Sequence, residues 1–143
     1  MKTSTRAAVA AIALLGSAGA ALADGDAVKG AKIFKKCMAC HKVGEGAKNG
    51  VGPLLNGIVG RPAGSVEGYV YSGLNKSSGA AGLLWTEDKI LAYLPDPNAF
   101  LKKLLTDAGK ADQATGTTKM TFKLPKEDER KDVIAYLKTF SKK

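Results

Sequence analysis

The chain has 143 residues, of which 45% are hydrophobic and 24% charged, a composition typical of one globular domain that excludes a fibrous or disordered chain. Aromatic residues make up only 6% and glycine numbers 17, so side chains alone build a thin core that a bound cofactor would complete. The formal net charge of +9 indicates either an acidic partner or a surface charge that only aids solubility.

The first 23 residues have the pattern of a secretory signal peptide. Lys2 and Arg6 form a positive start, residues 7–20 are an uncharged Ala-rich run, and residues 21–23 supply a small-x-small cleavage site. A permanent membrane anchor is the alternative, but the run is weakly hydrophobic and close to the shortest length that spans a bilayer. We therefore expect cleavage after Ala23 and an exported chain, residues 24–143, that forms a single domain without stable membrane insertion.

A first helix is predicted ahead of the two cysteines. Asp24 or Asp26 can cap its N-terminus, and the helix should end near His41. Apolar residues at spacings of three and four define its stripe: Val28, Ala31, Phe34 and Met38. Residues 43–82 are rich in Gly, Asn, Ser and Pro and predict an ordered loop with one short helical turn at most. A loop of this length needs an organising centre.

Two helices follow in quick succession. Thr86 caps the first, which has acidic residues in its opening turn and is stopped by Pro95. Asp96 caps the second, with Pro97 at its first helical position. The buried face of this second helix is predicted to consist of Phe100, Leu101, Leu104 and Leu105.

The chain is predicted to end in a helix over residues 126–140, after a polar loop at 108–118. Its apolar side is marked by Val133, Ile134, Leu137 and Phe140. No segment alternates as a strand does, and no internal repeat is present. The predicted fold class is therefore all-α with long loops.

The segment Cys37-Met38-Ala39-Cys40-His41 contains both cysteines and the single histidine of the chain. Two thiols three residues apart can add to the two vinyl groups of one haem, while the adjacent imidazole is brought under the iron as an axial ligand. A thioredoxin-like redox pair and a structural disulfide are the alternatives, and both leave His41 unexplained. A zinc site lacks a fourth ligand. The spacing predicts one covalent haem c.

A second axial ligand is expected from the other face of the haem. No second histidine exists, and the chain has three methionines. Met1 leaves with the signal peptide, and Met38 lies inside the attachment loop on the wrong side. Met120 remains; it sits in a polar loop, where a methionine that only filled a core would be out of place.

Further motifs follow in order along residues 24–143. They are Gly30 and Phe34, Gly52-Pro53-Leu54, residues 57–61, residues 69–72, Asn75-Lys76, Trp85-Thr86, Tyr93-Leu94, residues 119–122 and residues 134–137. With the attachment motif, they make the chain resemble the class I cytochromes c, and within them the bacterial cytochromes c2, which are similar to mitochondrial cytochrome c. The resemblance implies an all-α cytochrome c fold, with crossed N- and C-terminal helices and long loops wrapped around one covalently bound haem.

The resemblance also implies roles for individual residues. The carbonyl of Pro53 would accept the Nδ1 proton of His41. Tyr93 resembles the aromatic residue beside the methionine sulfur, and Thr118 the nearby hydroxyl. The groups that would hydrogen-bond the haem propionates are Arg61, Tyr71, Trp85 and Asn75.

Other implied contacts and departures concern the helices and loops. Gly30 and Phe34 would meet Tyr136 and Leu137 where the terminal helices cross. The chain departs from the family pattern by an extra Thr within residues 116–120. It is also longer than the mitochondrial form at residues 77–84 and 108–115, where it resembles the longer cytochromes c2.

Protein ligands on both faces of the iron would leave only the gain or loss of one electron, which argues against an enzyme. Lysines near the attachment and methionine segments should steer acidic partner surfaces to the exposed haem edge. These lysines are Lys35, Lys36, Lys48, Lys119 and Lys123.

The resemblance implies a soluble periplasmic carrier that takes electrons from a cytochrome bc1-type complex and passes them to a photosynthetic reaction centre or a terminal cytochrome oxidase. A monomer is expected. Nucleic acid is not expected as a partner, because the chain is exported and its lysines are dispersed. Two alternatives remain: a haem enzyme or gas sensor in which Met120 is not bound, and a thiol oxidoreductase.

Overall fold

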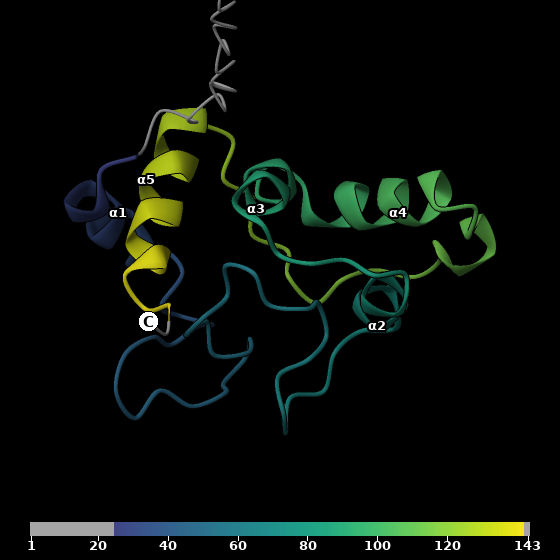
Figure 1. The fold of residues 1–143 in the computed structure, drawn as a ribbon, viewed down its shortest axis with the longest axis horizontal. Helices are drawn as coiled ribbons and strands as arrows, with labels where there is room; N and C mark the ends of the chain where they lie inside the picture. Colours follow the sequence, from purple (N-terminus) through teal and green to yellow (C-terminus); the bar gives the residue numbers. More distant parts are fainter. Residues whose placement is uncertain (1–24, 142–143) are drawn as a thin grey trace, which may run out of the picture.

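The structure is a computed structural model that describes residues 25–141; the expected signal peptide, residues 1–23, lies outside the described residues. Figure 1 shows its helices connected by long loops. The elements are α1 (Ala27–Phe34), α2 (Gly73–Ala80), α3 (Glu87–Tyr93), α4 (Pro97–Asp107), a 3-10 turn (Ala111–Gln113) and α5 (Glu127–Lys138). Within residues 25–141 no strand forms, and one isolated antiparallel bridge joins Pro62 to Leu84. The all-α prediction is confirmed.

Helix α1 is shorter than predicted, and of the predicted apolar stripe only Phe34 is fully buried. The Asp26 side chain caps it by accepting hydrogen bonds from the two backbone N–H groups of Val28 and Lys29, and the helix ends at Phe34 rather than near His41. The predicted stripe is wrong at both ends, because Val28 is 71% and Met38 47% exposed. The buried residues are Gly30 and Phe34, since the contact face is centred on a glycine that a search for apolar side chains overlooks.

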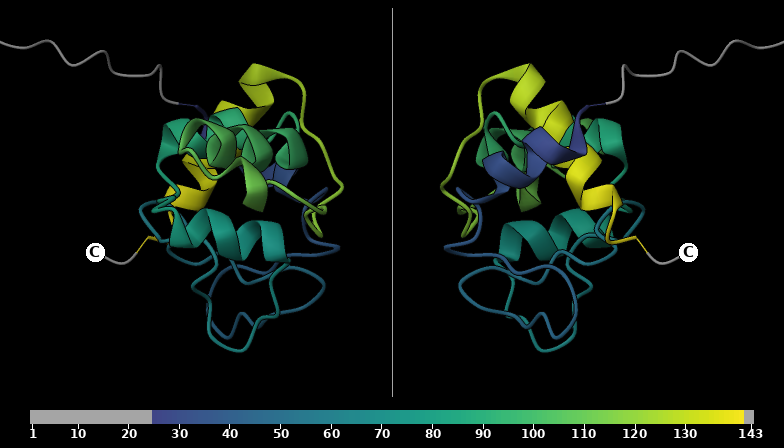
Figure 2. Two further views of the ribbon diagram at one scale, coloured as in Figure 1. Left: turned by 90° about the vertical axis from the view of Figure 1, so that its right-hand side faces the viewer. Right: turned by 90° about the vertical axis from the view of Figure 1, so that its left-hand side faces the viewer.

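Helices α1 and α5, from opposite ends of the described chain, pack across each other, as the right-hand view in Figure 2 shows. At Gly30 a Cβ atom would overlap the carbonyl oxygen of Asp132 and lie 2.8 Å from the Cβ of Tyr136. The ring centroids of Phe34 and Tyr136 are 5.4 Å apart. The predicted meeting of the terminal helices at Gly30 is confirmed, and it depends on the missing side chain.

Helix α2 was not expected beyond a single turn, because Gly, Asn and Ser are weak helix formers. Ser72 caps it by accepting from the N–H of Asn75 at 3.2 Å, and Leu74 is 2% exposed. At Gly79 a Cβ would overlap the carbonyl oxygen of Ala63. Packing against α4 and against the loop that contains Ala63 stabilises this helix. The local sequence does not show these contacts.

Helices α3, α4 and α5 form close to their predicted positions. Thr86 and Asp96 cap α3 and α4 through the N–H groups of Lys89 and Ala99. The buried face of α4 is narrower than predicted, with Leu101 and Leu105 fully buried but Phe100 and Leu104 only half-buried. Helix α5 runs Glu127–Lys138, inside the predicted bounds. In the described part of the chain, none of the helices combines the length and the apolar character needed to cross a bilayer.

Candidate cofactor site

The predicted attachment segment begins where α1 ends. Hydrogen bonds from the N–H of Cys37 to the carbonyl of Phe34 (2.8 Å) and from the N–H of His41 to the carbonyl of Cys37 (2.9 Å) fold it into consecutive turns. Cys37 and Cys40 are both half-buried and are not joined to each other. Burial raises the pKa of the Cys37 thiol to about 11, so this thiol is held in its protonated form near neutral pH.

The imidazole of His41 is held on two sides by the segment 50–53. Its Nδ1 lies 2.7 Å from the carbonyl oxygen of Pro53, and because a carbonyl only accepts, Nδ1 carries the proton and donates. A Cβ at Gly52 would lie 2.5 Å from Cε1 and 2.8 Å from Nδ1 of the ring, so glycine is required there. Burial lowers the pKa of His41, Arg61 lowers it further, and the Pro53 bond opposes both. A neutral ring presents the Nε2 lone pair to a metal.

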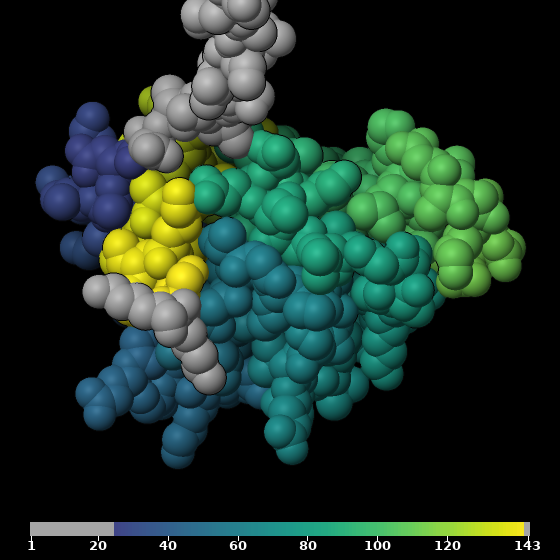
Figure 3. Space-filling view, viewed as in Figure 1, coloured from purple at the N-terminus to yellow at the C-terminus, as the bar shows by residue number. Residues whose placement is uncertain are grey.

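Two asparagines that the sequence analysis did not single out fasten the loops around His41. Asn49 accepts from the N–H of Leu54 and donates to the carbonyl of Glu67, each at 3.0 Å. Asn56 accepts from the N–H of Gly44 and donates to its carbonyl, each at 2.8 Å. These loops form the lower face of the molecule, in blue and teal in Figure 3. From sequence alone, an asparagine that joins two loops by hydrogen bonds cannot be distinguished from one that lies in an ordinary turn.

Arg61 is a half-buried cation without an acidic partner. Its guanidinium donates to the carbonyls of Asn56 and Leu54, each at 3.1 Å, and within residues 25–141 no carboxylate forms an ion pair with it. Burial lowers its pKa, whereas Tyr71 raises it. The hydroxyl of Tyr71 accepts from the N–H of Val66 at 3.2 Å. A partly buried positive charge of this kind is stabilised by an anion from outside the chain.

Two of the aromatic residues predicted for the site, Trp85 and Tyr93, lie together, whereas Tyr71 pairs with Tyr69. The buried ring of Trp85 contacts Tyr93, with centroids 4.7 Å apart, and stacks on Phe100 at 6.2 Å. The hydroxyl of Tyr93 donates to Sδ of Met120 at 3.5 Å, a long contact of the kind sulfur accepts. Burial raises the pKa of Tyr93 to about 12, with a hydrogen bond to Thr118 opposing it, so the hydroxyl stays a donor across the physiological range.

Thr118 and Asn75 connect the Met120 segment to α2. The Thr118 hydroxyl donates to Oδ1 of Asn75 at 3.0 Å and accepts from the N–H of Met120 at 3.3 Å. The Ser72 hydroxyl also donates to Oδ1 of Asn75, at 2.9 Å. Asn98, which the sequence analysis did not single out, accepts from the N–H of Thr118 at 3.1 Å. The polar group beside the sulfur is therefore larger than the resemblance implied.

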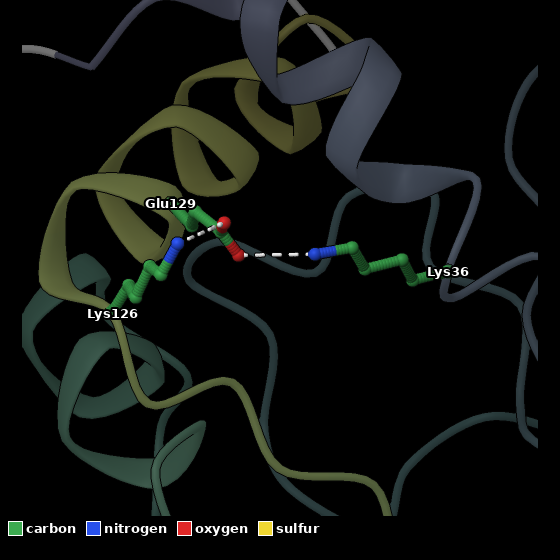
Figure 4. A network of polar contacts seen from close by, with 3 residues as sticks. All are labelled: Lys36, Lys126 and Glu129. Atoms are coloured by element: carbon green, nitrogen blue, oxygen red, sulfur yellow. Dashed lines mark hydrogen bonds and ion pairs between the residues drawn. The ribbon is translucent and has the colours of Figure 1, made fainter.

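All five lysines assigned to docking are exposed. Lys36 pairs with Glu129 at 3.2 Å, and Lys126 pairs with the same carboxylate at 3.6 Å, so Glu129 on α5 holds two cations (Figure 4). Lys123 pairs with Asp96 at 2.6 Å. Lys119 donates to the carbonyl of Val70 and lies 5.6 Å from the centre of the Tyr69 ring.

The remaining two docking lysines, Lys35 and Lys48, form no ion pair with residues 25–141.

The described residues fit a covalently attached haem. Two thiols three residues apart share one turn, an imidazole has its Nδ1 satisfied and its Nε2 free, and a methionine sulfur packs against the apolar core. The cation of Arg61 suits a carboxylate of such a group. Among residues 25–141 no three His, Cys, Asp or Glu side chains gather into a metal site. The donor set is that of a haem carrier, not of a bare metal ion.

Comparisons with known proteins agree with this chemistry. The family model described as cytochrome c matches residues 27–141. Cytochrome c2 iso-1 of Rhodospirillum centenum is 65% identical over 118 residues, covering 82% of this chain and 98% of that protein. A cytochrome c2 of Rhodopseudomonas palustris is 61% identical over 114 residues, covering 80% and 97%.

Solved structures extend the match to three dimensions. The structure of cytochrome c2 from Rhodospirillum centenum superposes with a TM-score of 0.81 at 63% identity, covering 82% of this chain and all of that one. Ferricytochrome c2 from Rhodopseudomonas palustris gives 0.77 at 61% identity, covering 80% and 98%. The chain therefore belongs to the cytochrome c family, and within it to the class I bacterial cytochromes c2, which carry one covalently attached haem c and act as electron carriers rather than enzymes.

Proposed function

We propose that this chain is a periplasmic one-electron shuttle in which Cys37 and Cys40 bind the haem covalently and His41 and Met120 are the axial ligands of its iron. When bound, the haem supplies an iron that gains or loses one electron. The observation that carries the proposal is the hydrogen bond between Tyr93 and Sδ of Met120, which holds a thioether inside an aromatic cluster.

His41 supplies a neutral nitrogen ligand. Its lowered pKa keeps the ring unprotonated near neutral pH, and the Pro53 carbonyl orients it and increases the basicity of Nε2. Gly52 allows the backbone to lie against the ring, which restricts its rotation. These contacts restrict the orientation of the ring, which would limit its reorganisation during electron transfer.

Arg61, Tyr71, Trp85 and Asn75 are proposed to receive the haem propionates. The guanidinium brings positive charge that has no acidic partner in residues 25–141, which offsets the cost of burying a carboxylate. The Oδ1 of Asn75 is occupied by the hydroxyls of Ser72 and Thr118. Its NH2 group is the part that donates to a propionate.

Electron exchange is proposed to take place at the acidic surfaces of membrane redox complexes. These are a cytochrome bc1-type complex as donor and a reaction centre or cytochrome oxidase as acceptor. The exposed docking lysines supply the complementary charge, and weak binding with fast, charge-steered association suits a shuttle. A cleaved signal peptide, residues 1–23, would deliver the chain to the periplasm as a soluble monomer.

The test is to replace Met120 by Ala in the holoprotein and to measure the reduction potential and the absorption spectrum. A thioether ligand favours ferrous iron, so its loss should lower the potential and abolish the charge-transfer absorption of the ferric protein. Met38→Leu is the matched control, because Met38 is a half-exposed methionine of the attachment loop. An unchanged potential in Met120→Ala would show that another group binds the iron.

Carbon monoxide separates the shuttle from a haem enzyme or gas sensor. The reduced parent protein should bind it slowly near neutral pH, because Met120 occupies the sixth position, whereas Met120→Ala should bind it rapidly. Rapid binding by the parent would favour an open site. The raised pKa of Cys37 argues against a thiol oxidoreductase, which needs a lowered one, and a haem stain on a denaturing gel tests that alternative directly.

A further inference from the structure

The Met120 segment reaches its place as a long connection between α4 and α5 that has little secondary structure of its own. Thr118 is 7% exposed, and its backbone N–H lies outside any helix. A buried N–H requires a partner. That partner is the side-chain oxygen of Asn98, which lies 20 residues earlier in the chain.

We propose that Asn98 is the positioning residue for the sulfur ligand: it holds Thr118, and through Thr118 it fixes where Met120 stands. The inference rests on the proposed ligation by Met120. Once the main chain of Thr118 is anchored, its hydroxyl is placed to accept from the N–H of Met120 and to donate to Asn75. The hydroxyl of Tyr93 then meets the sulfur at 3.5 Å.

The anchor is rigid because it belongs to the first turn of α4. Asp96 caps this turn, and Asn98 follows the buried Pro97, whose ring fixes the backbone φ angle. The same turn holds the segment a second time, since the carboxylate of Asp96 pairs with Lys123 at 2.6 Å. Met120 therefore lies between two points, Thr118 and Lys123, that are both tied to one helical turn.

The two ties differ in strength. The Asn98 bond is half-buried and serves a buried N–H, so its loss leaves an unsatisfied donor. The pair of Lys123 and Asp96 is 56% and 40% exposed and is screened by solvent. Asn98 should therefore control the position of the sulfur more than Lys123 does.

This anchor accounts for the extra Thr in residues 116–120. The bond to Asn98 fixes Thr118, two residues before Met120, so Thr117 and residues 108–116 lie outside the constrained part. Additional length ahead of Thr118 is accommodated without moving the methionine. Insertions at 108–115 are therefore compatible with an unchanged ligand.

The test titrates the ferric holoprotein with imidazole, which competes with Met120 for the iron, and follows loss of the sulfur-to-iron charge-transfer absorption. Asn98→Ala should bind imidazole about fivefold more tightly than the parent, the change expected from the loss of one net hydrogen bond. Asn98→Asp keeps an acceptor and should stay within about twofold of the parent. Lys123→Gln should also change binding by no more than about threefold.

Two further measurements separate positioning from general destabilisation. Amide hydrogen exchange at Thr118 should accelerate in Asn98→Ala and remain slow in Asn98→Asp. Lys103→Ala is the control on the same helix, since it breaks an exposed pair with Asp107 that involves neither Asn98 nor Thr118. It should leave imidazole binding unchanged.

Imidazole binding by Asn98→Ala equal to that of the parent, with the charge-transfer absorption intact in both, would overturn the inference and leave the proposed function standing. Equal loosening in Asn98→Ala and Asn98→Asp would also overturn it. Absence of the absorption from the parent would instead contradict ligation by Met120 itself.

Discussion

Replacing Gly30 by Ala should destabilise the protein, because α1 and α5 touch through their backbones at this position. The new Cβ would overlap the carbonyl oxygen of Asp132, and no side-chain rotation relieves a clash with backbone. Such overpacking costs about 1–3 kcal/mol. The forced separation also weakens the contact between Phe34 and Tyr136, worth about 0.5–1.5 kcal/mol. The better helix propensity of Ala returns about 1 kcal/mol, so the net loss is about 2 kcal/mol.

The assay is guanidinium unfolding of the oxidised holoprotein, in which this loss should lower the midpoint by about 0.6 M. Gly73→Ala is the matched control: it lies in the first turn of α2, its φ is negative, and a Cβ there meets nothing within 4 Å. It should leave the midpoint unchanged or raise it slightly. A Gly30→Ala midpoint equal to or above that of Gly73→Ala would refute the argument from backbone contact.

Three further outcomes are expected. Gly79→Ala, on the same helix as Gly73, should lower the free energy of unfolding by about 1–3 kcal/mol in the same assay, because its Cβ would overlap the Ala63 carbonyl oxygen. Asn49→Ala should cost about 2 kcal/mol by removing two hydrogen bonds and should speed amide exchange at Leu54, whereas Asn49→Asp, which keeps the acceptor, should slow that exchange again. Hydrogen bonds from the N–H of Ala99 and from Lys123 lower the pKa of Asp96 from 3.8. A carboxylate whose pKa is lower in the folded state stabilises the fold at pH values above its unfolded pKa, and this stabilisation is lost as the pH falls through the folded pKa. Below about pH 4, the melting temperature should therefore fall less steeply with pH in Asp96→Asn than in the parent.

Local chemistry made the second half of the fold predictable. Thr86 and Asp96 are capping residues whose side chains accept from free backbone N–H groups, and Pro95 prevents α3 from continuing. These helix boundaries can therefore be predicted from adjacent residues. Helix α2 could not be predicted in the same way. Its sequence is rich in Gly and Ser, and its stability comes from the burial of Leu74 and from the close approach of Gly79 to Ala63.

Some residues of the candidate site could likewise be recognised from local sequence, and others could not. The attachment motif is contiguous in sequence, so the sequence alone was enough to propose its chemistry, and Met120 was proposed by elimination because few methionines exist. The contact of Asn98 was not predictable, since its partner Thr118 lies 20 residues away in the sequence. The same holds for Asn49, whose partners Leu54 and Glu67 lie 5 and 18 residues after it in the sequence. Only the folded chain reveals which polar residues hold others in place.

The crossing of α1 and α5 has a consequence for how the protein matures. The segment with Cys37 and Cys40 directly follows α1, whose packing partner begins only at Glu127, near the other end of the chain. During synthesis, the contact between α1 and α5 therefore cannot form until residues 127–138 have been made. A product truncated before Glu127 would keep both cysteines but lack the helix that packs against α1.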